Sequence, residues 1–569
     1  MVGRARLVRW LQSPLAVAAV SVALCLPALG AGLFTDDHVL LGEIEGRFPP
    51  PHPWELYSFC PDGERLEELL AAGAYPWWTS PEARIRLFRP LPSLLIHAEH
   101  AVFGREPLGY HLVTLAAFAA MLLAASRVLR AALPGLLGGV AFAVFAWNDL
   151  QAQPASWLSN RHATLAACLG FAGVFLHVRR RERGDSWGGA SALGLSGLGL
   201  LCSEVGLQPL AYVLAYELSR RRIRPVLPAA ALAVGYLVAY QAFGFGTRGS
   251  AAYLDPFEDP AAFLLALARR LPAFAADLFA GVPLDLWLFA PGAQFALVAT
   301  GVAALALLGW GLWRTWPALE EAEARGLRWL LAGAALAAIP ATAGVPGSRL
   351  LLVPGLGAAA AVAALVVRLR GRPLATAAAV CLGALHLVWQ PILLLGQSRA
   401  IERIGHRSDA VARESELVAR EGTDVALLGV SDPHLGLYVG LQRLLSDRRP
   451  RSWHSLTMAA CEHRLERVAE DTLDVRLVGC RMMENDWERL FSPARRRFED
   501  GEVVKVPGLR VEIVETAGGA PVRLRFQFDR SLDDPDLALL AWRDGALRRL
   551  RFPPEGQGQV VVPPLEGQP

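Results

Sequence analysis

Long apolar runs alternate with short polar segments through the first 396 residues of the chain. Each run is rich in Leu, Ala, Val and Gly, and most are long enough to cross the roughly 30 Å of hydrocarbon in a bilayer. The pattern predicts a mainly α-helical, polytopic transmembrane bundle with about eleven spans, at residues 14–33, 108–128, 133–147, 158–178, 189–203, 204–219, 225–244, 291–313, 327–343, 350–367 and 373–396. Several of these runs are short for a full crossing, which a helix tolerates where it lines a cavity enclosed by protein.

Arginine clusters between the runs predict how the bundle is oriented. Arg4, Arg6 and Arg9 precede the first run, which indicates a signal anchor with a cytoplasmic N-terminus; a cleaved signal peptide is the alternative. Further basic clusters follow at every second turn, as expected of cytoplasmic loops. An odd number of spans then puts the loops 34–107 and 245–290, and the residues after 397, on the opposite side of the membrane.

The character of the sequence changes after residue 396. Residues 423–445 have the pattern of a strand, a turn and a helix, and later residues alternate like strands joined by Gly and Pro turns. We expect a transmembrane domain over 1–396. Over 397–569 we expect a soluble periplasmic region, in which a small α/β piece is followed by a β-sandwich-like module. Cys461 and Cys480 lie in this region and either pair, as an oxidising compartment allows, or stay free.

The composition supports the membrane class and excludes several kinds of function. Hydrophobic residues make up 53% of the 569 residues and charged residues only 19%. The formal net charge of +3 is too small to indicate a nucleic-acid partner, so membrane lipids are the expected surroundings. The preference for Arg over Lys, with abundant Ala, Gly and Leu, indicates a GC-rich bacterial genome and hence a bacterial inner membrane. The motifs of serine hydrolases, P-loop ATPases, zinc proteases and dinucleotide-binding proteins do not occur in their required contexts.

An acidic pair follows the first apolar run directly. Asp36 and Asp37 stand in FTDDHVLLGEIEG, where a carboxylate is costly to keep ionised unless it faces water, a cation or a substrate. Two adjacent carboxylates also repel each other, which raises one pKa unless a metal or an arginine is near. The pair is therefore the leading candidate for a functional site. The alternative is that Asp36 caps the following helix and that Asp37 is simply solvated.

The order of further segments resembles that of the GT-C glycosyltransferases, a superfamily of membrane enzymes. After the acidic pair come a loop rich in Pro and aromatic residues, then RLFRPLPSLLIHAEHAVFGREPLGYHLVTL, ASWLSNRHATLAACLG, LCSEVGLQPLAYVL and GSRLLLVPGLG. The nearest likeness is to the branch that includes the protein O-mannosyltransferases and related bacterial enzymes. It covers roughly residues 10–395 and rests on order more than on strict motifs. Many members have Asp-Glu where this chain has Asp-Asp, which leaves the use of a metal open.

The resemblance implies transfer of a sugar from a polyprenyl-phosphate donor to an acceptor at the outer face of the membrane. In the family the acidic pair engages the acceptor, a divalent cation, or both. Asp36 or Asp37 would then be the general base and, if a cation is used, would bind it. The departing phosphate would be stabilised by arginines near outer helix ends, namely Arg89, Arg161 and Arg349. Each of these arginines alone could instead be an interfacial anchor.

Two more residues are candidates for substrate binding. His38 adjoins the acidic pair, and Glu204 is an acid within an apolar stretch, where it binds substrate, caps a helix or pairs with Arg161. The partners implied are a lipid-linked sugar donor, membrane lipids, and an acceptor that is a glycan, a lipid or a protein. The alternative functions are a transporter or flippase of lipid-linked or anionic substrates, and a non-catalytic membrane scaffold.

Overall fold

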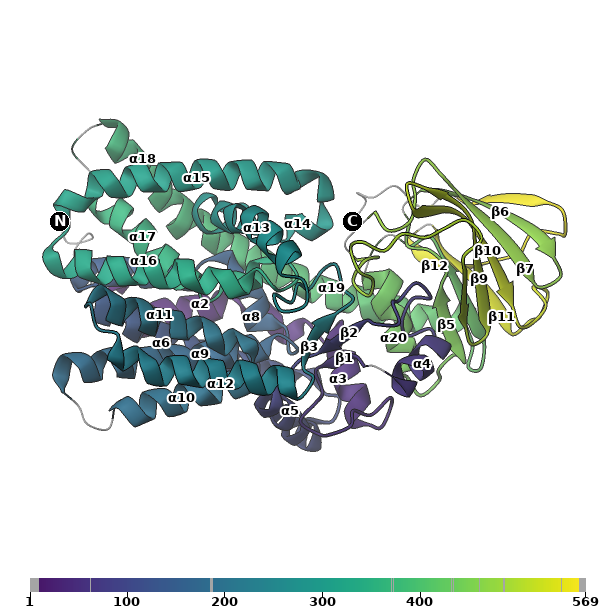
Figure 1. The fold of residues 1–569 in the computed structure, drawn as a ribbon, viewed down its shortest axis with the longest axis horizontal. Coiled ribbons are helices and arrows are strands. Elements are labelled where there is room, and N and C mark those ends of the chain that lie inside the picture. The colour runs from purple at the N-terminus through teal and green to yellow at the C-terminus, as the bar shows by residue number, and fades with distance from the viewer. Residues whose placement is uncertain are drawn as a thin grey trace.

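The chain forms an elongated molecule with a helical bundle at one end and a β-rich region at the other (Figure 1). The structure is a computed structural model, which describes residues 10–61, 63–184, 188–369, 371, 373–430, 432, 434–459, 461–484, 487–543 and 545–561. Arg4, Arg6 and Arg9, on which the predicted orientation of the first run depends, lie outside the described residues.

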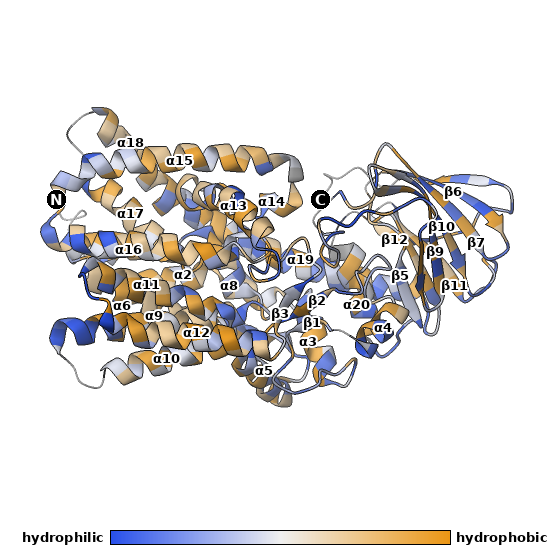
Figure 2. Cartoon of the chain, viewed as in Figure 1, coloured by the Kyte–Doolittle hydropathy of each residue, from blue (hydrophilic) through white to orange (hydrophobic). Residues whose placement is uncertain are grey.

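The bundle consists of helices that, apart from α18, share one apolar core. In chain order they are α2 (Pro14–Leu24), α6 (Pro107–Ala132), α7 (Gly135–Ala146), α9 (Arg161–Arg183), α10 (Gly188–Cys202), α11 (Leu207–Ser219), α12 (Leu227–Ala242), α13 (Pro260–Ala280), α15 (Gln294–Thr315), α16 (Glu321–Ala341), α17 (Gly355–Arg368), α18 (Pro373–Ala384) and α19 (Gln390–Val418). The helices of the bundle are coloured mostly as hydrophobic along their length (Figure 2). Phe295 and Trp313 on α15 are 84% and 69% exposed, so large apolar side chains lie on the outside of the bundle. A surface of this kind is suited to contact with lipid.

The number of spans differs from the sequence prediction. Within the described residues, five helices are both long and apolar enough to cross a membrane: Pro107–Ala132, Arg161–Arg183, Arg224–Ala242, Gln294–Ala318 and Pro373–Val418. Other predicted runs form shorter helices, such as α7 with 12 residues and α17 with 14, so about eleven full crossings are not confirmed. The helix of the last run also continues to Val418, well beyond residue 396, because its polar second half still has one buried face.

Ion pairs join the helix ends at the side of the bundle away from the β-rich region. Arg220, which follows α11, contacts Glu182 of α9 at 3.4 Å, and Arg368 at the end of α17 contacts Glu323 of α16 at 2.6 Å. The described N-terminal residues lie at this same end (Figure 1). The arginine clusters between the apolar runs therefore gather on one side of the bundle.

Two loop segments, 34–107 and 245–290, lie between the bundle and the β-rich region, except that α13 of the second segment packs within the bundle (Figure 1). They contain α3 (Asp36–Ile44), α4 (Glu64–Ala71), α5 (Pro90–Phe103) and α14 (Leu286–Phe289). The two segments share an antiparallel sheet of β1 (Ser58–Cys60), β2 (Arg84–Arg86) and β3 (Gly246–Arg248). The indole N–H groups of Trp77 and Trp78 donate to the carbonyl oxygens of Leu456, at 3.0 Å, and Glu488, at 2.8 Å. These buried bonds fix the first loop segment to the β-rich region.

The β-rich region contains two sheets that pack on one another. One has the strand order β12-β11-β4-β5, and the other is antiparallel with the order β13-β6-β7-β10-β9-β8. The strands are β4 (Asp424–Leu428), β5 (Ser452–Ser455), β6 (Glu462–Ala469), β7 (Thr472–Val478), β8 (Val503–Val506), β9 (Leu509–Ala517), β10 (Ala520–Phe528), β11 (Leu537–Arg543), β12 (Ala546–Leu550) and β13 (Gly558–Val561). Helix α20 (Val439–Leu444) lies between β4 and β5 in the chain. Leu428 and Leu539 of the first sheet share a core with Val475 and Phe526 of the second.

The predicted α/β piece begins with β4, α20 and β5 and is followed by the antiparallel strands β6 to β10, but the later strands β11 and β12 then join the sheet of β4 and β5, which was not predicted. Strand β11 pairs in parallel with β4, with Leu537 opposite Asp424, and β6 to β10 of the other sheet lie between them in the chain. Alternating apolar residues identify strands but not the partners of those strands, so the pairing of β11 with β4 could not be predicted from the sequence. Cys461 and Cys480 form a disulfide.

Candidate functional site

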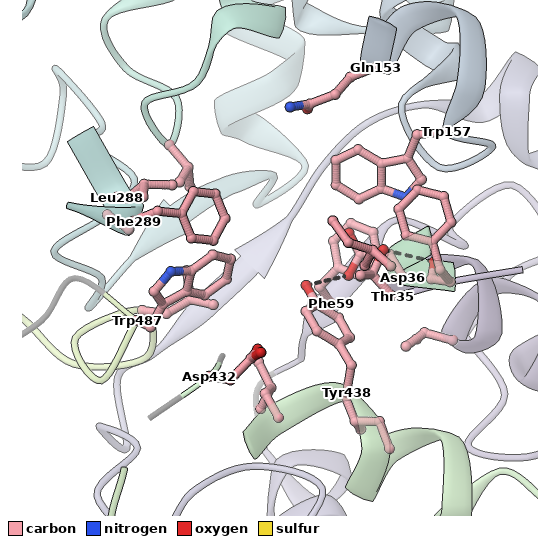
Figure 3. Close-up of a pocket in the computed structure, with 18 of the residues that line it drawn as sticks. Thr35, Asp36, Phe59, Gln153, Trp157, Leu288, Phe289, Asp432, Tyr438 and Trp487 are labelled. Atoms are coloured by element: carbon pink, nitrogen blue, oxygen red, sulfur yellow. Dashed lines mark hydrogen bonds between the residues drawn. The ribbon is translucent and has the colours of Figure 1, made fainter. Parts of the chain in front are cut away.

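A cavity of about 1390 Å³ lies where the bundle, the two loop segments and the β-rich region meet. Its wall includes residues of α3, α14, α19 and α20, and of the short helices η2 (Asp149–Gln151), α8 (Ala152–Ser156) and η7 (Ser348–Leu351). Figure 3 shows Phe289 and Trp487 on one side of the cavity and Trp157 and Phe59 on the other. Phe289 lines the cavity and is also 50% exposed, so the cavity lies beside apolar surface at the end of the bundle.

Asp36 lines this cavity at the first turn of α3, beyond the first apolar run. The preceding residue, Thr35, has a φ of 54°, which is unfavourable for a β-branched side chain and is typical of a functional site. The Tyr438 hydroxyl, from the β-rich region, donates to Asp36 Oδ1 at 3.0 Å (Figure 3). Burial raises the pKa of Asp36 to about 6, and the Tyr438 bond and the charges of Arg349 and Arg89 limit that rise. Asp36 is therefore mostly ionised at pH 7 and close to its titration range, as a general base should be.

Asp37 is fully buried and does not line the cavity. Its Oδ1 accepts the backbone N–H of Ser159 at 2.8 Å, and its Oδ2 accepts the N–H of Phe34 at 3.3 Å. Burial raises the pKa of Asp37 to about 8, against the effect of these two bonds, which favour the ionised form. The side chain thus ties the loop before Asp36 to the turn before α9.

Arg349 is the predicted arginine that lines the cavity. Its Nη1 donates to Gln153 Oε1 at 3.4 Å, and its guanidinium carbon lies 5.6 Å from the centre of the Trp157 ring. Asp285 positions the neighbours of Arg349, since its carboxylate accepts hydrogen bonds from Gln153 Nε2 at 3.0 Å and from the Ser348 N–H at 3.2 Å. Among the described residues Arg349 forms no ion pair, so its charge is available to an anion in the cavity.

Arg89 and Glu204 bind each other and do not line the cavity. The guanidinium forms two bonds to the carboxylate, one of them from Nε to Oε2 at 3.2 Å, and lies 4.9 Å from the centre of the Tyr57 ring. Glu204 therefore pairs with Arg89 and not with Arg161, which corrects one of the alternatives from the sequence. The charge of Arg89 still acts on Asp36, whose pKa it lowers.

Arg161 and His38 are buried beside the cavity wall. Arg161 is 1% exposed and pairs with Glu99 of α5 through two bonds, one of them 2.9 Å long. His38 Nε2 lies 3.7 Å from Asp409 Oδ1, but burial lowers the pKa of His38 to about 4, so the ring is neutral at pH 7. The structure thus brings Asp36 and Arg349 together at the cavity and puts the other predicted residues behind it.

The side chains around the acidic pair do not by themselves form a metal site. Both oxygens of Asp37 accept backbone N–H groups, and one oxygen of Asp36 accepts the Tyr438 hydroxyl. In the described parts of the chain, no group of three or more His, Cys, Asp or Glu side chains is arranged to hold an ion. A divalent cation bound by the pair stays a prediction, and no step below depends on it.

Tyr438, Gln153 and Asp285 were not predicted from the sequence. Tyr438 is 402 residues from its partner Asp36 in the chain, and nothing near it in the sequence indicates a site. Asp285 carried a weak signal, because it is an acid next to an apolar run; it precedes its run, whereas Asp36 follows one.

No family model and no curated protein matches the sequence of the chain. Its fold is similar to the oligosaccharyltransferase of Archaeoglobus fulgidus in complex with Zn and sulfate, with a TM-score of 0.41 and 12% identity, over 77% of this chain and 62% of that one. It is also similar to ArnT from Cupriavidus metallidurans in the apo state, with a TM-score of 0.38 and 14% identity, over 90% of this chain and 97% of that one. For ArnT bound to undecaprenyl phosphate the TM-score is 0.30 and the identity 14%, over 75% and 84% of the two chains.

The chain thus spans about three fifths of the length of the oligosaccharyltransferase. Because all three TM-scores are below 0.5, we infer the function from the chemistry of the cavity and not from these similarities. The likeness to the O-mannosyltransferase branch stays a prediction.

Proposed function

We propose that the protein is a membrane glycosyltransferase of the GT-C type. It would move a sugar from a polyprenyl-phosphate donor to an acceptor hydroxyl at the outer face of the membrane. The observation that carries this proposal is that Asp36, a carboxylate, and Arg349, a guanidinium without an ion-pair partner among the described residues, line one cavity at the end of an apolar bundle. The order of segments that resembles the GT-C superfamily supports the same class.

In the proposed reaction the acceptor oxygen attacks the anomeric carbon of the donor sugar. Asp36 accepts the hydroxyl proton, the new bond forms between the acceptor oxygen and the sugar, and the bond between the sugar and the phosphate oxygen breaks. The charge that develops on the departing phosphate is stabilised by Arg349, which can bind two phosphate oxygens at once. Gln153, which is hydrogen-bonded to Asp285, positions Arg349, and Tyr438 orients Asp36.

A lipid-linked donor fits the surroundings of the cavity. Leu286 and Phe289 line it and are 38% and 50% exposed, so a polyprenyl chain could lie on apolar surface while its phosphate reaches Arg349. The acceptor would be a glycan, a lipid or a protein that carries a free hydroxyl.

We also propose that the protein lies in a bacterial inner membrane, with residues 1–396 as the transmembrane domain and 397–569 as the periplasmic region. The disulfide Cys461–Cys480 supports this side for the β-rich region, since disulfides persist in oxidising compartments. The arginine clusters at the opposite end of the bundle support a cytoplasmic position for that end. An alkaline phosphatase reporter fused to the C-terminus should be active in cells, and an inactive reporter would overturn this orientation.

The reaction can be tested with purified protein, polyprenyl-phosphate sugars carrying a radiolabel, and a membrane extract as the source of acceptor. Wild-type protein should move the label to an acceptor, and Asp36→Asn should reduce the rate at least 100-fold. Asp533→Asn is the matched control, because Asp533 is an exposed acid of the β-rich region that pairs with Arg467. Equal rates for Asp36→Asn and wild type would refute the role of Asp36.

The same experiment separates the alternative functions. A transporter or flippase would move the labelled lipid across a vesicle membrane without breaking the bond between sugar and phosphate. A scaffold would do neither. No transfer from any of the donors by the wild-type protein would refute the proposed enzyme.

A further inference from the structure

A second polar group lines the cavity two helical turns along α3 from Asp36. Asp36, Val39 and Glu43 follow the spacing i, i+3, i+7, so they lie on one face of the helix, and all three line the cavity. The first and last of them are about 10 Å apart along the axis, at 1.5 Å per residue. One cavity wall therefore carries two carboxylates at a distance too long for them to act on the same atom.

Glu43 is paired with an arginine that reaches it from the next helix. Arg65 Nη2 donates to Glu43 Oε1 at 2.8 Å and to the carbonyl oxygen of Phe48 at 2.7 Å. Phe48 has a φ of 49°, which is strained for a residue other than glycine, and Arg65 holds this turn in place. Glu43, Arg65 and Phe48 all line the cavity.

The pair retains hydrogen-bonding capacity that the fold does not use. Glu43 is 5% exposed, and its Oε2 has no hydrogen-bond partner among the described residues, nor do Arg65 Nε and Nη1. Buried polar groups normally form hydrogen bonds. The acceptor Glu43 Oε2 and the donors Arg65 Nε and Nη1 are therefore expected to bind a ligand in the cavity. The ion pair Arg86–Glu55 in the same loop segment differs in that Glu55 does not line the cavity.

The chemistry of the pair and its neighbours selects one class of ligand. A ligand that satisfies it must offer both donors and acceptors at close spacing, and vicinal hydroxyl groups do so. An isolated anion would be repelled by Glu43, and an isolated cation by Arg65. Aromatic side chains complete the wall, since Phe48 and Tyr75 also line the cavity, and their faces suit the apolar face of a sugar ring.

We infer that Glu43, Arg65, Phe48 and Tyr75 form a subsite for a carbohydrate, which is the sugar of the acceptor that receives the transferred residue. That the bound sugar belongs to the acceptor rests on the proposed function. That a sugar binds here rests on the residues of the cavity wall alone. The subsite holds the acceptor sugar while its reactive hydroxyl reaches Asp36 at the other end of the same helix face. The acceptor is then a glycan or glycolipid and not an unmodified protein.

Binding can be measured by saturation-transfer NMR on the full-length protein in lauryldimethylamine oxide, a detergent without a sugar headgroup. The probes are glucose, galactose, mannose, arabinose and N-acetylglucosamine as methyl glycosides. The variant is Glu43→Leu with Arg65→Leu, which removes both charges together and leaves no unpaired ion. The matched control is Glu55→Leu with Arg86→Leu, and the thermal midpoints of both are compared.

At least one glycoside should bind the wild type and the control, and should bind the Glu43/Arg65 variant at least 10-fold more weakly. Equal binding by the variant, or no binding of any glycoside to the wild type, would overturn the subsite. If a sugar binds through Glu43 and Arg65 but no label is transferred from the lipid donor, the subsite stands and the proposed function fails. If transfer occurs and the variant keeps the wild-type KM for the acceptor, the function stands and the subsite fails.

Discussion

The hydroxyl of Tyr438 should set the pH at which the protein becomes active. It donates to Asp36 Oδ1 at 3.0 Å, and a hydrogen bond to a charged group contributes about 1.5–3 kcal/mol. Tyr438→Phe removes this bond from the ionised form of Asp36, so the pKa of Asp36 rises. At 1.36 kcal/mol for each pH unit, the acidic limb of the pH profile of kcat/KM should move up by about 1 to 2 units.

The acidic limb moves to higher pH because the reaction needs the ionised form of Asp36. A general base acts when ionised, and the pKa of Asp36 is raised to about 6 in the folded protein, so wild-type activity should fall as the pH drops through about 6. At pH 7 roughly nine tenths of Asp36 is then ionised, and in the variant between about a half and a tenth. The variant should be slow at pH 7 and recover at pH 9, where Asp36 is ionised again.

The assay is label transfer measured from pH 5 to pH 9, with the donor well below its KM. Tyr253→Phe is the control, because Tyr253 lines the same cavity and has no hydrogen bond to Asp36 among the described residues. Its acidic limb should stay where the wild-type limb is. If the limb of Tyr438→Phe also stays in place, Tyr438 does not stabilise the ionised form of Asp36 and the reasoning is wrong.

Three further predictions concern other parts of the structure. Arg349→Met should lower kcat/KM for the lipid donor about 10- to 150-fold, the equivalent of about 1.5–3 kcal/mol. The kcat/KM of Arg349→Lys should lie between those of Arg349→Met and the wild type, because lysine keeps the charge but cannot form two parallel hydrogen bonds as a guanidinium does. Equal values for all three proteins would exclude a phosphate contact. Asp37→Ala should lower the free energy of unfolding by about 1–3 kcal/mol for each of the two amides it leaves unpaired, as measured by thermal unfolding in detergent, and an unchanged midpoint would contradict its bonding. Reduction of Cys461–Cys480, which are 19 residues apart, should destabilise the β-rich region by about 3 kcal/mol, and the Cys461→Ser/Cys480→Ser protein should then show no further effect of reductant.

Features that depend on neighbouring residues could be predicted from the sequence. Apolar runs indicated the helices of the bundle, and alternating residues indicated strands such as β9 and β10, because the side chains along one element share one environment. Asp36 stood out because an acid after an apolar run is unusual at any position in the fold. The number of crossings could not be derived in this way, since a short apolar helix inside a bundle has the same composition as part of a longer one.

Partners far apart in the chain could not be predicted. Arg89, Arg161 and Arg349 have similar surroundings in the sequence, yet the first two are neutralised by Glu204 and Glu99 and only the third faces the cavity. Which arginine meets a carboxylate is decided by the packing of helices that are many residues apart. The hydroxyl of Tyr438 reaches Asp36 for the same reason, through the docking of the β-rich region.

The parallel pairing of β11 with β4 has a consequence for the synthesis of the protein. Trp542, on β11, lines the same cavity as Asp36, and β4 has only β5 beside it until β11 is added. Contacts between distant residues form late, so in the proposed orientation a nascent chain carries Asp36 through the membrane long before the surroundings of Asp36 exist. A ribosome that stops before residue 537 therefore releases a protein whose bundle is complete and whose cavity is open on one side, which should leave it inactive.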